Sequence, residues 1–127
     1  MDLVQWLREQ LDEDERIARA VEDRSAPWDG QWVADGDDAA RTFNGHVLFY
    51  GHGDRSLKPG LVAHVVEHDP ARVLREIEAK RQLVTLHSEG SSELFCSNCE
   101  HEPPCPTLRL LALPYADRPG YREEWRP

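Results

Sequence analysis

The chain has neither a long apolar run nor a basic leader. A membrane-spanning helix needs about 20 consecutive apolar residues, and no stretch of the 127 residues approaches that length. The opening stretch, MDLVQWLREQLDEDE, lacks the basic start and the apolar core of a signal or transit peptide. We therefore expect a cytoplasmic protein without a membrane partner.

Familiar catalytic patterns are missing as well. The sequence contains no glycine-rich phosphate loop, no nucleophile elbow and no internal repeat. Hydrophobic residues make up only 39% of the chain, which predicts a modest core with ordered loops. The length favours a single domain over residues 1–127. We expect a mainly α fold with a minor β element, and a function that leans away from catalysis.

Basic residues are scarce at the start of the chain. Residues 1–40 hold 12 acids and 4 bases, a net charge of −8, whereas residues 41–127 hold 12 acids and 11 bases, a net charge of −1. An acidic segment repels phosphate, which disfavours direct binding of nucleic acid. We prefer the simpler interpretation, a solvated acidic helix face, with a basic protein partner as the alternative. The candidate partner-binding residues are Asp12, Glu13, Asp14, Glu15, Glu22 and Asp23.

Two long helices are predicted. Residues 2–24 form an acidic helix that Asp2 caps, because apolar residues recur at steps of three and four. Residues 70–87 form a central helix, with Asp69 as its N-cap and Pro70 at its first position. The apolar positions are Leu3, Val4, Leu7, Leu11, Ala18 and Val21 in the first helix, and Val73, Leu74, Ile77, Leu83, Val84 and Leu86 in the second.

Shorter elements are expected between and after these helices. Residues 25–45 read as an irregular segment that Trp28 and Trp32 anchor to the core, and residues 46–50 as a short strand. Residues 59–68 suit either a strand or a short helix, with a slight preference for the helix. Near the C-terminus, we expect Thr107 to cap a short helix that stops around Pro114, and the two tail aromatics, Tyr121 and Trp125, to fold back onto the domain.

All three cysteines lie within ten residues, in the stretch CSNCEHEPPC. Two thiolates in a Cys-x-x-Cys spacing reach one tetrahedral ion, and Cys105 adds a third sulfur at the start of a helix. Residues 96–116 are therefore predicted to form a zinc segment followed by the C-terminal helix. The competing interpretation of Cys96 and Cys99 is a pair of free or redox-active thiols, but the thioredoxin-like context for a redox pair is absent.

Two histidines compete for the fourth position of the zinc site. His87 closes the central helix, and its use would link that helix, the cysteine loop and the last helix. His101 is more local, but its short spacing to Cys99 is awkward. We prefer His87, which gives the set His87, Cys96, Cys99 and Cys105, with His101 as the alternative. Because four protein ligands leave no open position, we expect a structural zinc ion.

Other histidines suggest weaker possibilities. His64, Glu67 and His68 match the His-x-x-Glu-His pattern of a zinc hydrolase, although Pro59 and Pro70 confine any helix there to about two turns. His46 and His52 flank a glycine-rich turn and are read as surface histidines, with a second metal site as the alternative.

Three long strings carry a family resemblance. DLVQWLREQLDEDERIARA (2–20), HDPARVLREIEAKR (68–81) and PCPTLRLLALPYADRPGYREEW (104–125) resemble an uncharacterised family of small acidic proteins from high-GC Gram-positive bacteria and their phages. The resemblance implies a histidine near the end of the central helix, a Cys-x-x-Cys and a Pro-Cys, which fall on His87, Cys96, Cys99 and Cys105. It implies no activity.

These observations predict a non-enzymatic, zinc-stabilised protein-interaction module. One version is a modulator carried by a phage or mobile element, whose acidic face mimics nucleic acid and blocks a basic host protein. The alternatives are a small metal-dependent hydrolase using His64, Glu67 and His68, and a DNA-binding zinc protein that contacts DNA through Arg109, Arg118, Arg122 and Arg126.

Overall fold

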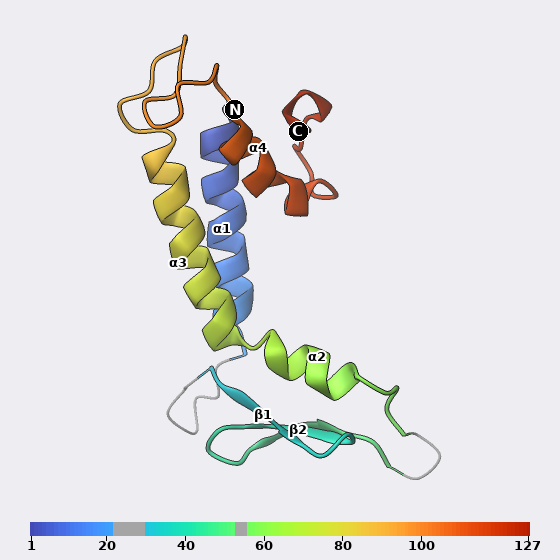
Figure 1. Cartoon of the computed structure of the whole chain (residues 1–127). Coiled ribbons are helices and arrows are strands. Elements are labelled where there is room, and N and C mark those ends of the chain that lie inside the picture. Colours follow the sequence, from blue (N-terminus) through green and yellow to red (C-terminus); the bar gives the residue numbers. More distant parts are fainter. Residues whose placement is uncertain (22–29, 53–55) are drawn as a thin grey trace. The chain divides into compact units, whose positions relative to one another are not determined.

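A computed structural model describes residues 1–21, 30–52 and 56–127 (Figure 1). By its internal contacts the chain divides into two compact units. The first unit combines Met1–Asp14 with Glu76–Pro127, and the second unit is Glu15–Arg75. Most of the regular structure is helical, and the described residues form one small sheet, in the second unit. This confirms the predicted mainly α fold with a minor β element. The assignment of residues 1–127 to a single domain stays a prediction.

The first helix, α1 (Leu3–Arg19), begins as predicted and ends early. The Asp2 carboxylate caps it by accepting the backbone N–H of Gln5 at 2.8 Å. The predicted extension to residue 24 is wrong at residues 20 and 21, which form a turn, and residues 22–24 lie outside the described residues. Val21 is 47% exposed and not part of the core, because no helical turn continues to orient it inward. The buried positions of α1 are Leu3, Trp6, Leu7, Leu11 and Ala18.

The central helix, α3 (Pro70–Leu86), confirms the prediction to within one residue. Asp69 caps it, since its Oδ1 accepts the N–H of Arg72 at 2.9 Å. Ile77 and Val84 are buried, seven residues apart and therefore on one face. The predicted apolar face was too wide, because Leu83 and Leu86 point away from that face and are 38% and 54% exposed.

The second unit contains a three-stranded antiparallel sheet in the order β1-β2-β3, formed by Trp32–Asp35, Ala39–Thr42 and Val47–Tyr50. The last strand confirms the predicted strand at 46–50. The predicted irregular segment at 25–45 is wrong for β1 and β2: the DGDD turn joins them as a hairpin, with Gly36 at φ 64°. Trp32 lies in β1, and Trp28 is outside the described residues.

Helix α2 (Leu61–Glu67) resolves the ambiguous segment 59–68 as a helix. It begins after Gly60, which adopts the left-handed conformation, at φ 83°. Figure 1 shows α2 along one face of the sheet, and the fully buried Ala40 of β2 and the buried Val62 of α2 belong to the core between them.

The C-terminal region packs on the start of α1 in the first unit. Helix α4 (Pro106–Ala112) continues into the 3₁₀ turn η1 (Leu113–Tyr115), and a last turn, η2 (Glu123–Trp125), ends the chain. Thr107 is not the N-cap as predicted. Cys105 occupies that position, because Pro106 already starts the helix.

The expected folding back of the tail is confirmed. The indole of Trp6 lies 5.8 Å from the ring of Tyr121 and 5.4 Å from that of Trp125, measured between ring centroids. Trp6 Nε1 also donates to the Pro119 carbonyl at 3.1 Å. These contacts form an aromatic core that joins two ends of the chain more than 110 residues apart.

Candidate metal centre

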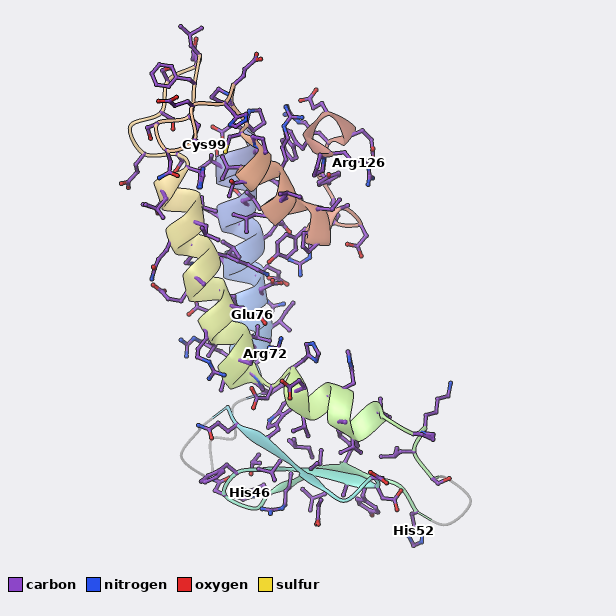
Figure 2. All side chains as sticks on the ribbon, viewed as in Figure 1. His46, His52, Arg72, Glu76, Cys99 and Arg126 are labelled. Atoms are coloured by element: carbon purple, nitrogen blue, oxygen red, sulfur yellow. The ribbon has the colours of Figure 1, made fainter. Side chains whose placement is uncertain are left out.

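One end of the first unit gathers a histidine and three cysteines. His87 directly follows α3, Cys96 and Cys99 lie in the next loop, and Cys105 is the N-cap of α4. Their ligand atoms all lie within 4.8 Å of one another. Figure 2 labels Cys99 at this end, near the last turn of α3 and the first turns of α1 and α4. Among the described residues, this set is the group of three or more side chains able to hold a metal ion.

The distances fit tetrahedral coordination. His87 Nδ1 lies 3.5 Å from the Sγ of Cys96 and 3.5 Å from the Sγ of Cys105. A tetrahedral zinc ion with Zn–S of about 2.3 Å and Zn–N of about 2.05 Å would separate sulfur from nitrogen by about 3.5 Å. His87 therefore stands at the spacing from Cys96 and Cys105 that a bound ion would impose, with Nδ1 as the histidine donor, and Cys99 Sγ lies within 4.8 Å of the other three ligand atoms.

The cluster is closed to solvent on most sides. Cys96 and Cys105 are 1% and 0% exposed, His87 is 9% exposed and Cys99 is half-buried. Burial raises the pKa of the Cys96 thiol, but the nearby N–H groups of Cys99 and Asn98 and the His87 side chain outweigh it and lower the pKa to about 6. Burial raises the pKa of Cys105, which has fewer compensating donors. A thiolate is thus favoured at Cys96, as a metal ligand requires.

Backbone hydrogen bonds shape the cysteine loop. The N–H of Glu100 donates to the Cys96 carbonyl at 2.8 Å, and the N–H of Cys96 donates to the His101 carbonyl at 2.7 Å. Glu100 adopts φ 62°, a left-handed conformation that is uncommon outside glycine. Ser97 ties the loop back toward α3, since its Oγ donates to the Glu89 carbonyl at 2.7 Å. This tight turn brings the sulfurs of Cys96 and Cys99 into the same cluster.

The structure brings His87, not His101, into the cluster. His101 is exposed and its Nδ1 lies 2.9 Å from the Cys99 carbonyl oxygen. The other candidate metal site is not assembled among the described residues. His64 lies on α2 and His68 is its C-cap, with ring centroids 4.5 Å apart. Glu67 pairs with Arg72 at 3.1 Å, and no third ligand among the described residues joins the two imidazoles.

The remaining histidines do not converge. His46 and His52 are both exposed, and Figure 2 labels them at separate places along the sheet of the second unit. No group of metal-ligating side chains forms around either of them in the described part of the chain.

Intramolecular contacts engage much of the predicted acidic face. Asp12 pairs with Arg81 at 2.7 Å, Asp14 binds both Arg118 and the hydroxyl of Tyr115, and Glu15 pairs with Arg19. The side chain of Asp14 is only 19% exposed. Glu13 also has a contact within the chain, and Glu22 and Asp23 lie outside the described residues.

The arginines proposed for DNA contact are likewise engaged within the first unit. Arg109 donates to the carbonyls of Pro104 and Glu124, and Arg118 pairs with Asp14. Arg122 and Arg126 pair with Glu124 and Glu123. These guanidinium groups stabilise the packing of the C-terminal region. The four arginines named for DNA contact are therefore already paired within the chain.

The sequence analysis missed two features beside the cluster. A groove of about 600 Å³ has His87 in its wall together with apolar side chains and the carboxylates of Asp2 and Glu93. The loop after α3 also has acids as its only charged residues, since no Lys or Arg lies between Arg81 and Arg109. That gap in the basic residues was visible in the sequence, whereas the groove depends on the packing of the N-terminus against the C-terminal region.

Comparisons with known proteins identify a family but no activity. The model of DUF6221, a family of unknown function, matches residues 1–127. No curated protein and no solved structure matches the chain. Among the described residues, none of the helices is both long and apolar enough to cross a membrane.

Proposed function

The chain belongs to the DUF6221 family of unknown function, and we propose that it is a non-enzymatic protein-interaction module held together by a structural zinc ion. His87, Cys96, Cys99 and Cys105 would hold the ion. Zinc is the metal we assign because one imidazole and three thiolates are a ligand set typical of structural zinc. When bound, the ion supplies a crosslink between α3, the cysteine loop and α4.

The closed geometry argues against catalysis at this centre. A catalytic zinc site keeps a coordination position open for water or substrate, whereas here four protein ligands lie within 4.8 Å of one another and three of them are buried. The ion's role would then be to fix the conformation of the loop between α3 and α4.

The exposed surface of that loop is the main support for the proposed protein binding. Glu89, Glu93, Glu100 and Glu102 are exposed, and no ion pair joins any of them to a described residue. Leu94 and Phe95, in the same loop, are 80% and 50% exposed. A rigid acidic surface with two projecting apolar side chains fits a protein partner that offers an apolar pocket with a basic rim.

The groove beside the cluster extends this surface. Its apolar lining includes Leu3, Leu108 and Trp125, and Glu93 belongs to both the groove and the acidic loop. It would accept an apolar side chain from the same basic partner. The resemblance to proteins of high-GC Gram-positive bacteria and their phages suggests a host protein as the class of partner, with the chain acting as its modulator.

Affinity capture with matched variants tests the interaction. The zinc-loaded chain is compared with a Leu94→Ser/Phe95→Ser variant, and a Leu110→Ser variant is the control because Leu110 is 58% exposed on α4, outside the loop. A bound protein that is lost with the loop variant, retained with the control and released by salt supports the proposal. Zinc content is measured for every variant, so that loss of the partner is separated from loss of the fold. Capture of no specific protein, or equal capture by all three, contradicts it.

A further inference from the structure

Within the described part of the second unit, α2 lies along one face of the sheet, and the other face carries two strongly exposed side chains on β3. Residues directly opposite each other in antiparallel strands share a face. The strand register therefore places Asp35, Ala39 and Tyr50 in one row across the sheet and Val33, Arg41 and Val47 in the next. These six residues form what we call the outer face. The alternate row, Ala34, Ala40 and Phe49, points to the face along which α2 lies (Figure 1).

The outer face is most exposed on β3. On the outer face Val33, Ala39 and Arg41 are half-buried and Asp35 is exposed, and on the α2 side Ala34 is exposed and Phe49 is half-buried. Ala40 on the α2 side is completely buried, whereas Val47 and Tyr50 on the outer face are 63% and 66% exposed. A sheet normally buries one apolar face and presents polar residues on the other. Here the outer face instead presents an exposed valine and an exposed tyrosine on β3, which makes it a candidate contact surface.

The outer face also carries one charge of each sign. Asp35 and Arg41 sit on neighbouring strands, in adjacent rows, and no hydrogen bond or ion pair joins either side chain to a described residue. Diagonal neighbours on a sheet face are about 7–8 Å apart. The surface is therefore both apolar and self-complementary in charge, because an identical copy offers an arginine for its aspartate and an aspartate for its arginine.

We propose that the outer face is a homodimer interface, with a second copy of this chain as its occupant. In a face-to-face dimer the two-fold axis runs midway between Asp35 and Arg41. Each carboxylate then meets the guanidinium of the other copy, so that two identical ion pairs form. The valines and tyrosines of the two copies pack between the sheets, as in a two-sheet sandwich.

Charge counts favour this surface for self-association. Residues 15–75 hold 10 acids and 8 bases, a net charge of −2, so that two second units repel each other little. The first unit holds the remaining 14 acids and 7 bases, a net charge of −7, and its acidic loop would repel a copy of itself. The two surfaces would thus bind different partners. The acidic loop would bind a basic protein, and the outer face would bind a second copy of the chain.

The size of the face sets the strength of the dimer. Three strands of four residues cover about 13 Å by 14 Å, an area of about 180 Å². A standard stable interface buries roughly 800 Å² per partner, so this face supplies under a quarter of that area. The dimer is accordingly weak and depends on concentration.

Sedimentation of the zinc-loaded full chain from about 1 µM to about 1 mM tests the proposal. The mass rises with concentration toward twice the monomer mass of 14.6 kDa. Tyr50→Ser, at a residue two-thirds exposed in the chain, shifts the dissociation constant at least about tenfold without lowering the melting temperature. A chain that remains monomeric throughout this range, or a dimer indifferent to Tyr50→Ser, overturns the proposal.

A charge swap distinguishes this interface from any other dimer contact. Asp35→Arg and Arg41→Asp each place like charges opposite each other and weaken the dimer. The double variant Asp35→Arg/Arg41→Asp restores opposite charges and recovers it. Lys58→Asp is the control, because it makes the same change of charge as Arg41→Asp at an exposed residue beyond the strands. Equal weakening by the control, or no recovery in the double variant, contradicts the assigned pairing.

Discussion

A methyl group on Gly120 would stand 2.9 Å from Nε1 of Trp6, closer than side-chain atoms pack in folded proteins. The backbone of the C-terminal tail therefore approaches the indole as closely as only glycine allows. The same indole nitrogen donates to the carbonyl of Pro119, and Trp6 is only 3% exposed. This contact fixes the tail against the start of α1 and closes the aromatic core of the first unit.

Gly120→Ala is expected to destabilise the chain strongly. The added methyl meets the indole, and φ 85° at this residue is a conformation that alanine adopts poorly. Gly90→Ala is the matched control in the same unit, since it has a similar φ of 71° but its nearest contact would be an ordinary 3.7 Å. Urea unfolding should show Gly120→Ala to be less stable than the control by about 1–3 kcal/mol. Equal stability of the two variants would mean that the tail moves freely.

His87→Ala should remove bound zinc, whereas His101→Ala should not. Of the two histidines, His87 directs a ring nitrogen toward the sulfurs of Cys96 and Cys105. Mutation of a residue that supports a metal ligand lowers metal affinity by roughly 10–100-fold, and loss of a ligand itself should lower it further. Elemental analysis of untagged protein should give one zinc per chain for the wild type and for His101→Ala. Zinc retained by His87→Ala and lost by His101→Ala would reverse the ligand assignment.

Removal of the metal should unfold the loop and loosen the aromatic core. Free energy of metal binding in such sites is largely free energy of folding. Chelation is expected to lower the melting temperature and to reduce the near-ultraviolet circular dichroism of Trp6 and Trp125, and added zinc should restore both. Cys96→Ser is the control, because a chain unable to bind zinc should not respond to the chelator. An unchanged melting temperature in the chelated wild type would argue that the fold does not depend on the ion.

Tyr115→Phe should cost far more stability than Asp12→Asn. The Tyr115 hydroxyl is buried and donates to Asp14 Oδ2 at 2.7 Å, and burial together with that carboxylate raises the pKa of Tyr115, so the phenol stays a donor. A hydrogen bond to a charged group contributes about 1.5–3 kcal/mol. Asp12 pairs with Arg81 on the surface, where its side chain is 72% exposed, and such pairs contribute about 0–1 kcal/mol. Denaturant unfolding of both variants measures the difference.

Local chemistry made the helices and the ligand set predictable. Asp69 followed by Pro70 marks the start of α3 in the sequence as clearly as in the structure, because capping needs only neighbouring residues. The cluster of His87 with the three cysteines was foreseen because Cys-x-x-Cys spacing keeps two sulfurs close together, and a histidine at the end of a helix is well placed to join them. That the cluster binds zinc stays a prediction.

The hairpin of β1 and β2 was not foreseen, because its strands are only four residues long and carry few β-formers besides Trp32 and Val33. Their pairing depends on contact with α2 and β3, which the periodicity of a single segment does not reveal. The ion pairs and hydrogen bonds within the acidic face of α1 were not foreseen for a related reason. Asp14 looks free in the sequence, but Arg118 and Tyr115, more than 100 residues away, engage it in the fold.

The order of residues along the chain was enough to predict where the two long helices start and which four side chains are suited to a metal. It also shows that the charged residues between Arg81 and Arg109 are all acids. These follow from neighbouring residues and from spacing along the chain. Packing in three dimensions settled which acidic side chains of α1 are paired, how closely the tail approaches Trp6, and that Val47 and Tyr50 on β3 are exposed. Those properties depend on contacts between distant segments, whose free energies are set by packing rather than by the order of residues along the chain.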